Sequence, residues 1–119
     1  MSGLPPLELG YAHTELRREL VDAVLRGEKT ATAGLLASYE AESEEPERIG
    51  SRCALLGFDG EPVAVVEITE SRVVPAAEID EEFARDEGEG YDSVEEWRSA
   101  HERFFDRPIG QDTPIVAVR

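Results

Sequence analysis

The middle of the chain carries the pattern that most restricts its fold. Residues 52–58 and 62–74 are rich in valine, leucine and isoleucine, and the Asp-Gly pair between them is typical of a hairpin turn. A two-stranded hairpin is only marginally stable by itself, so further strands must pair with it. Residues 114–119 and part of 29–34 are the candidates. The pattern therefore predicts a sheet built from distant parts of the chain.

Helical signals surround this β-rich centre. Thr14 suits an N-cap and Gly27 a left-handed C-cap, so the first helix is expected between them. A short helical turn over 35–39, a short helix over 76–86 and a longer helix over 93–106 are also expected from the spacing of apolar residues. This order predicts an α+β fold, with a small β-barrel or mixed sheet flanked by helices.

The length of 119 residues suits one domain that can bury well over half of its unfolded surface. Residues 1–13 contain Pro5, Pro6 and Gly10 and are expected to form an irregular lead-in. Residues 14–119 are expected to form the single domain. The oligomeric state stays open at this point.

The cysteine count and the hydropathy pattern bear on the compartment. Cys53 is the single cysteine and has no partner for an internal disulfide, which is typical of a reducing compartment. The first residues lack the basic end and apolar core of a signal peptide. No apolar run approaches the roughly 18 to 20 residues of a membrane span. We therefore expect a cytoplasmic protein without a membrane partner.

Net charge restricts the nucleic acids that the chain can bind. The 27 acidic residues against 12 basic ones give a net charge of −15, which repels long polyanions. A partner such as a long duplex nucleic acid is therefore not expected. A local cationic pocket for one nucleotide stays compatible with this charge, and the acidity is also explained by solubility alone.

Lys29 is the only lysine among the twelve basic residues, and it lies in a segment between Gly27 and Gly34. The charge state of a lysine responds to burial, whereas arginine stays protonated. Thr30 and Thr32 follow Lys29 closely, and a lysine within hydrogen-bond reach of a hydroxyl can act as its base. The alternative is an ordinary loop in which both threonines bond to their own backbone.

Two further places combine polar side chains with a special position. Glu87 follows an expected helix end, in a loop whose glycines allow close approach to another element. His101 lies four residues after Trp97 on the apolar face of the last helix, where a histidine is more often a core residue than a ligand. His13 and Cys53 are isolated, so no metal site is predicted, and no glycine motif indicates a phosphate-binding cofactor.

In their order along the chain, these motifs resemble the ASCH domain family, and in particular its bacterial YhfF-type branch. The resemblance covers nearly the whole chain from about Thr14 onward. The residues that carry it are Gly27 to Ala33, Tyr39-Glu40, Glu82-Phe83-Ala84, Glu87 to Gly90, Trp97-Arg98, His101, Phe104-Phe105 and Arg107.

The resemblance implies a fold similar to the PUA RNA-binding domain, with a β-barrel-like core and the lysine loop at the mouth of a cleft. It implies that this cleft binds RNA or a nucleotide-like ligand. Some small bacterial members of the family are amidohydrolases that remove the acetyl group from N-acetylated cytidine, and their catalytic lysine, threonine and glutamate match Lys29, Thr32 and Glu87. Another relative is a ribonuclease.

If the chain is an amidohydrolase, its three candidate catalytic residues can take two alternative sets of roles. In the first, Lys29 is the base, Thr32 is the nucleophile or positions water, and Glu87 orients Lys29. In the second, Lys29 stays charged and stabilises a developing oxyanion while Glu87 acts as the base through water. The residues alone leave both sets open.

The alternative hypothesis is that the chain binds its partner without hydrolysing it, and the partner is then a nucleoside, a nucleotide or a short single-stranded RNA. Lys29 and arginines such as Arg52 or Arg98 would then contact phosphate, and Tyr39 or Tyr91 would stack on a base. Thr30 and His101 complete the candidate ligand-binding residues.

Overall fold

The structure is a computed structural model that describes residues 3–119. Its helices are α1 (Glu15–Leu25), α2 (Leu36–Ala41), α3 (Glu81–Asp86) and α4 (Val94–Phe105), with one 3-10 turn, η1 (Ala76–Glu78). Its strands are β1 (Pro6–Leu7), β2 (Thr32–Leu35), β3 (Arg52–Leu56), β4 (Pro62–Glu67), β5 (Ser71–Pro75) and β6 (Pro114–Val118). The predicted α+β fold is confirmed.

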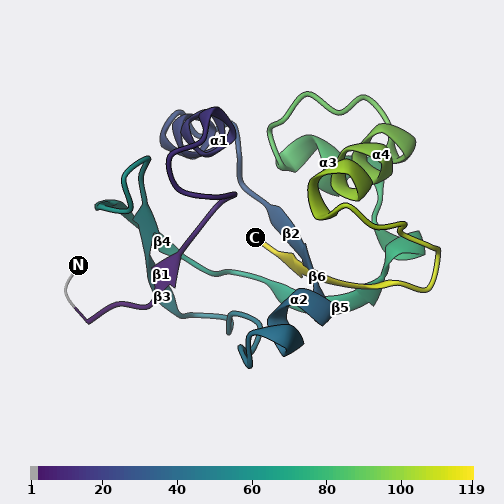
Figure 1. The fold of residues 1–119 in the computed structure, drawn as a ribbon, viewed down its shortest axis with the longest axis horizontal. Helices are drawn as coiled ribbons and strands as arrows, with labels where there is room; N and C mark the ends of the chain where they lie inside the picture. The colour runs from purple at the N-terminus through teal and green to yellow at the C-terminus, as the bar shows by residue number, and fades with distance from the viewer. Residues whose placement is uncertain (1–2) are drawn as a thin grey trace.

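The strands form two three-stranded sheets (Figure 1). One has the order β1-β3-β4, in which β1 and β3 run parallel and β3 and β4 antiparallel. The other is antiparallel and has the order β2-β6-β5. The first sheet is thus a mixed sheet, whereas the barrel-like core implied by the resemblance is not closed within residues 3–119.

The predicted hairpin turn is present between β3 and β4, but the strand pairing differs from the prediction. The expected strand over 62–74 is two strands in different sheets, because its ladder changes partner at Ile68–Glu70. There the amide of Thr69 donates to the carbonyl of Arg119. Residues 114–118 therefore pair with β5 on one side and with residues 32–35 on the other, and the hairpin instead gains β1 from the lead-in.

Local capping signals account for the helix starts. The hydroxyl of Thr14 accepts a hydrogen bond from the Arg17 amide, and the hydroxyl of Ser93 accepts one from the Glu96 amide. Such side-chain caps satisfy amides that have no partner inside the helix. The predicted N-cap at Thr14 is confirmed, and Gly27 adopts the expected positive φ of 80° after α1.

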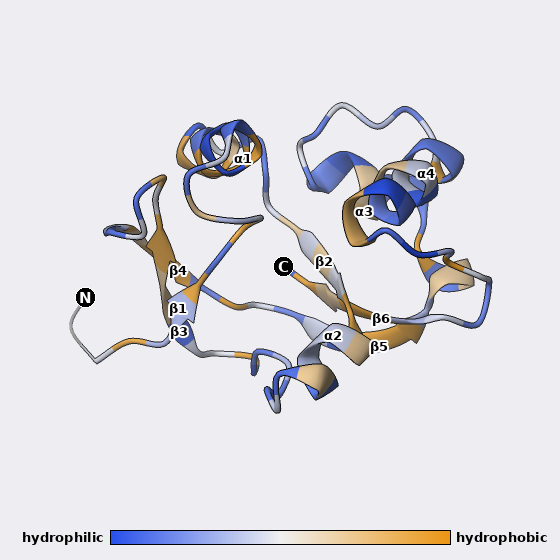
Figure 2. Ribbon diagram, viewed as in Figure 1, coloured by the Kyte–Doolittle hydropathy of each residue, from blue (hydrophilic) through white to orange (hydrophobic). Residues whose placement is uncertain are grey.

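Two separate apolar clusters support the two halves of the molecule. The larger joins the second sheet to α3 and α4 around Trp97, which is fully buried. The smaller joins α1 to β3 through Leu20, Val21 and Leu55. Figure 1 shows α1 above the first sheet and α3 and α4 on the other side of β2. Figure 2 shows that hydrophobic residues are concentrated on β4 and β5.

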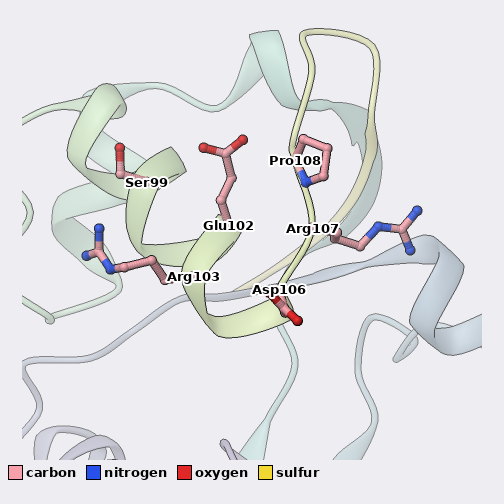
Figure 3. Close-up of a pocket in the computed structure, with 6 residues that line it drawn as sticks. All are labelled: Ser99, Glu102, Arg103, Asp106, Arg107 and Pro108. Atoms are coloured by element: carbon pink, nitrogen blue, oxygen red, sulfur yellow. The ribbon is translucent and has the colours of Figure 1, made fainter.

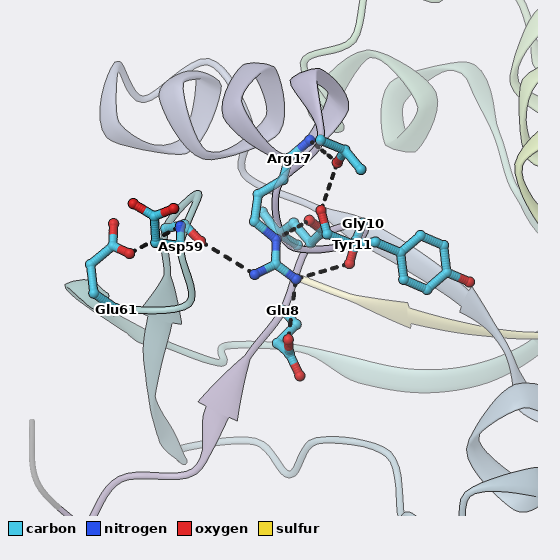
Figure 4. Close-up of polar contacts among 9 residues, drawn as sticks. Glu8, Gly10, Tyr11, Arg17, Asp59 and Glu61 are labelled. Atoms are coloured by element: carbon cyan, nitrogen blue, oxygen red, sulfur yellow. Dashed lines mark hydrogen bonds and ion pairs between the residues drawn. The ribbon is translucent and has the colours of Figure 1, made fainter.

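Arg17 ties the lead-in to α1 and to the hairpin (Figure 4). Its side chain is buried, and its guanidinium donates to the carbonyls of Leu9, Gly10 and Gly57. It also pairs with the carboxylate of Glu8 at 3.2 Å. Since a buried charge is costly without partners, this network holds the lead-in in one arrangement.

Replacing Arg17 with methionine is expected to lower the free energy of unfolding by about 3 kcal/mol, because it leaves buried carbonyls without their donor. Urea unfolding measures the change. Arg48→Met is the control, because Arg48 makes one exposed ion pair with Glu45, and it is expected to cost less than about 0.5 kcal/mol. Equal losses in the two variants would contradict a structural role for the Arg17 network.

Candidate functional site

Lys29 is buried after α1, and three acceptors surround its ammonium. Nζ donates to the carbonyl of Ala31 at 2.8 Å, to the carbonyl of Glu87 at 3.2 Å and to Oε2 of Glu89 at 3.3 Å. An ammonium carries three N–H donors, so these contacts use all of them. The surroundings of Lys29 are therefore those of a charged lysine.

The glycine loop after α3 approaches the lysine segment very closely. The amide of Thr30 donates to the carbonyl of Asp86 at 2.7 Å. Gly88 has φ of 69°, and a Cβ atom built on it would lie 2.5 Å from the carbonyl oxygen of Glu28. Only glycine fits such a position without displacing backbone. This contact brings Glu87 and Glu89 to Lys29.

The carboxylates of the two glutamates in this loop have different partners. The carboxylate of Glu89 contacts Lys29 and also accepts a hydrogen bond from the Tyr91 hydroxyl at 3.2 Å. The carboxylate of Glu87 points elsewhere, with Oε1 3.5 Å from Nε2 of His101. Within residues 3–119, the hydrogen bond of Glu87 to Lys29 is therefore made by its backbone carbonyl alone, and Glu89 is the carboxylate partner that the sequence prediction missed.

Glu87 and His101 form a buried pair above Trp97. Nδ1 of His101 lies 2.8 Å from the carbonyl of Trp97, which makes Nδ1 the protonated nitrogen of the neutral ring. The ring stacks on Trp97 with centroids 4.4 Å apart. Glu87 is 1% exposed, and its Oε2 has no hydrogen-bond partner among the described residues. One carboxylate oxygen is therefore free for a ligand or a water.

The pair shifts the titration of the histidine. Burial by itself lowers the pKa of His101, but the hydrogen bond and negative charge of Glu87 outweigh it, so the pKa is raised. The geometry explains this direction, because the neutral ring would turn the lone pair of Nε2 toward a carboxylate.

This raised pKa predicts a pH-dependent contribution to stability. A histidine with a raised pKa in the folded state stabilises the fold fully below its unfolded pKa of about 6.5, and the contribution is lost as pH rises through the folded pKa. Urea unfolding of the wild type and of Glu87→Gln, measured between about pH 6 and pH 9, is expected to show a stability difference that shrinks as pH rises. A difference that grows with pH would contradict the pairing.

A cleft of about 930 Å³ connects these groups. Lys29, Thr32 and Glu87 all line it, and the predicted ligand residues Tyr39, Tyr91 and His101 line it as well. No hydrogen bond joins Lys29 to the Thr32 hydroxyl anywhere in residues 3–119. Within the described residues, the structure therefore brings the three proposed catalytic residues to one cleft without a hydrogen bond between Lys29 and Thr32.

Three predicted ligand residues do not line this cleft. The hydroxyl of Thr30 donates to the carbonyl of Asp86, as a loop threonine bonded to backbone would. Arg52 lies exposed on β3, 3.7 Å from the carboxylate of Glu67. Arg98 lies on α4, and its Nε is buried without a partner among the described residues. The cleft therefore lacks the two arginines that were expected on phosphate.

The aromatic side chains of the cleft differ in their hydrogen bonding and in their exposure. The hydroxyl of Tyr39 donates to the carboxylate of Glu47, and burial followed by the Glu47 charge raises the pKa of Tyr39. By contrast, Tyr11 and Phe104 stack on each other where they line the cleft, with ring centroids 5.7 Å apart, and are 69% and 36% exposed. Sequence reasoning missed this pair, because no local pattern places the lead-in against α4.

A second, more open hollow of about 530 Å³ lies at the end of α4 and contains none of the predicted site residues (Figure 3). Its lining residues are Ser99, Glu102, Arg103, Asp106, Arg107 and Pro108. Among residues 3–119, no group of three histidine, cysteine or acidic side chains is arranged to hold a metal ion. In the same range, no helix has the length and hydrophobicity needed to cross a membrane.

Two small sheets, helices on their flanks and a cleft beside a buried lysine define an α+β domain of the PUA-like class. The chain belongs to the ASCH domain family, whose model matches residues 9–114. Assignment to the YhfF-type branch stays a prediction.

Two solved structures are similar to this chain, and one of them is an ASCH domain. A protein from Enterococcus faecalis is 26% identical, with a TM-score of 0.84, and the match covers 99% of this chain and 75% of that one. An ASCH domain from Lactobacillus crispatus is 26% identical, with a TM-score of 0.79 over 97% of this chain and 76% of that one. No curated protein matches the chain.

Proposed function

We propose that the cleft binds a nucleoside-like ligand and hydrolyses an N-acyl amide on it, with acetylated cytidine as the model substrate. The observation that carries the proposal is the presence, on one cleft, of a buried ammonium and a buried carboxylate with a free oxygen. These are Lys29 and Glu87. Amide hydrolysis needs a group that stabilises an oxyanion and a group that accepts a proton from water.

The contacts of Lys29 favour one of the two sets of roles. An ammonium that donates to two carbonyls and a carboxylate has no lone pair with which to act as a base. We therefore assign Lys29 to oxyanion stabilisation. The substrate oxygen would replace the contact with Glu89, which is the longest of the three at 3.3 Å.

Glu87 would then be the base, acting through its free Oε2. Water adds to the acyl carbon and gives its proton to Glu87, while the carbonyl oxygen takes the negative charge beside Lys29. Collapse of this intermediate breaks the C–N bond, and the amine leaves with the proton returned by Glu87. The products are the carboxylic acid and the free amine. His101 is a positioning residue, because its Nε2 lies near Oε1 and leaves Oε2 available.

Thr32 is proposed to position the attacking water. It begins β2 opposite Val118 and lines the cleft, and the ladder of β2 with β6 fixes its backbone. A hydroxyl on a rigid strand can hold a water molecule without moving during the reaction.

Removal of the Lys29 charge is the direct test. Lys29→Met is expected to lower acetate release from acetylated cytidine by about 10²-fold or more, which is the usual effect of losing a main oxyanion stabiliser. Glu28→Gln is the matched control, because Glu28 is an exposed neighbour paired with Arg26, and it should keep full activity. Absence of turnover in the wild type, or equal turnover in Lys29→Met, would contradict the proposed function.

A further inference from the structure

Negative charge dominates the lining of the cleft. Seven carboxylates line it against three lysine or arginine side chains. The acidic residues are Glu8, Glu42, Glu44, Glu45, Glu47, Glu87 and Glu89, and the basic ones are Arg17, Lys29 and Arg48. Such an excess gives the space between the walls a negative potential.

Each of the three cations already has partners of its own. Arg17 donates to backbone carbonyls and to Glu8, and Lys29 pairs with Glu89. Arg48 pairs with Glu45 at 3.1 Å. Within residues 3–119, the cleft therefore offers no unpaired lysine or arginine to a phosphate group.

The acidic rim lies in the segment directly after α2, and we define it by Glu42 and Glu44. Both side chains are exposed, and neither has a basic partner in the described structure. Desolvation, followed by the negative charge of Glu42, raises the pKa of Glu44. An anion at this rim would add to this repulsion.

The interior of the same cleft favours a hydrogen-bond donor rather than an anion. The buried Oε2 of Glu87 is an acceptor without a donor, and an N–H group of a ligand would satisfy it. At the mouth, the stacked Tyr11 and Phe104 present aromatic faces to a planar ring. A flat ligand with N–H donors and no negative charge fits both features.

We propose that the cleft accepts an uncharged planar nucleoside and rejects its phosphorylated form, with the acidic rim as the determinant of this selectivity. The inference rests on the proposed function for its ligand class. It goes beyond that function because it excludes nucleotides and RNA as ligands of this cleft and assigns the discrimination to Glu42 and Glu44.

Calorimetric binding of cytidine and of cytidine 5′-monophosphate tests the proposal, because neither probe contains an acyl group that can be hydrolysed. At an ionic strength of about 0.02 M, the nucleoside is expected to bind at least about tenfold more tightly. The ratio should fall toward one at about 0.5 M salt. It should also fall in Glu42→Gln/Glu44→Gln, whose substitutions are exposed and leave the core intact.

Glu19→Gln/Asp22→Asn is the matched control, because it makes the same change in net charge on the exposed face of α1, away from the cleft. It should keep the wild-type ratio. A loss of selectivity in this control equal to that in the rim variant would overturn the assignment to the rim. Equal or tighter binding of the monophosphate by the wild type would overturn the inference and leave the proposed nucleoside site standing.

Inorganic phosphate separates the two hypotheses if neither probe binds. That outcome would contradict the proposed nucleoside function and, with it, the acceptance of a nucleoside by the cleft. The rejection of phosphate is then judged from NMR spectra recorded with about 10 mM phosphate, a concentration that detects weak anion sites of millimolar affinity. Unchanged amide signals around the cleft would support rejection of phosphate, and saturable shifts there would overturn it.

Discussion

Replacing Gly88 with alanine is expected to lower the free energy of unfolding by about 3 to 4 kcal/mol. The added Cβ would lie 2.5 Å from the carbonyl oxygen of Glu28, and the φ of 69° is itself unfavourable for alanine. Because this contact joins the loop of Glu87 and Glu89 to Lys29, the variant should also lose ligand binding. Urea unfolding and cytidine binding measure the two effects.

Gly90→Ala separates the close contact from the backbone strain. Gly90 also has a positive φ, 82°, but no atom lies within 4 Å of the position that its Cβ would take. It should cost only about 1 to 2 kcal/mol, the usual penalty for a left-handed alanine. Equal losses of stability for Gly88→Ala and Gly90→Ala would contradict the claim that glycine is required at position 88 because of its close contact with Glu28.

The second large effect is expected at Trp97. Trp97→Ala should lower the free energy of unfolding by about 3 to 5 kcal/mol, because it empties a site that is 0% exposed at the centre of the larger apolar cluster. It also removes the ring on which His101 stacks, so the pH dependence that comes from the His101–Glu87 pair should weaken. Urea unfolding at several pH values measures both.

Trp97→Phe keeps this prediction testable if the alanine variant does not fold. The indole Nε1 has no hydrogen-bond partner among the described residues, so phenylalanine loses packing but no hydrogen bond. It should cost about half as much as alanine and keep an aromatic ring beside His101. A phenylalanine variant as unstable as the alanine variant would contradict an account based on packing.

Local signals explain why the helices and the hairpin turn could be predicted. Thr14 and Ser93 bond to amides three residues away, so their effect is visible in the sequence. Strand partners depend on distant segments. The change of sheet at Ile68–Glu70 depends on Arg119, whose carbonyl is 50 residues away from Thr69. No local pattern encodes that contact, and the prediction of one continuous strand was wrong there.

At the site, too, the sequence predicts the segments that come together better than the contacts of single side chains. The lone lysine and the glycine-rich loop could be found in the sequence, and the structure brings both to one cleft. Glu87 and Glu89 are two residues apart, and only the backbone path through Gly88 decides which carboxylate meets Lys29. Arg17 was missed for a related reason, because an arginine on a helix normally lies in solvent.

NMR titration with cytidine, the product of the proposed hydrolysis, tests the central claim that this cleft is the ligand site. Saturable shifts are expected at the amides of Lys29, Gly34, Gly88 and Glu89, which lie in or beside the cleft, with no shift at Gly60 in the hairpin turn. Lys29→Met should weaken the binding. Shifts confined to the hollow at the end of α4, or no shifts at millimolar cytidine, would contradict the claim.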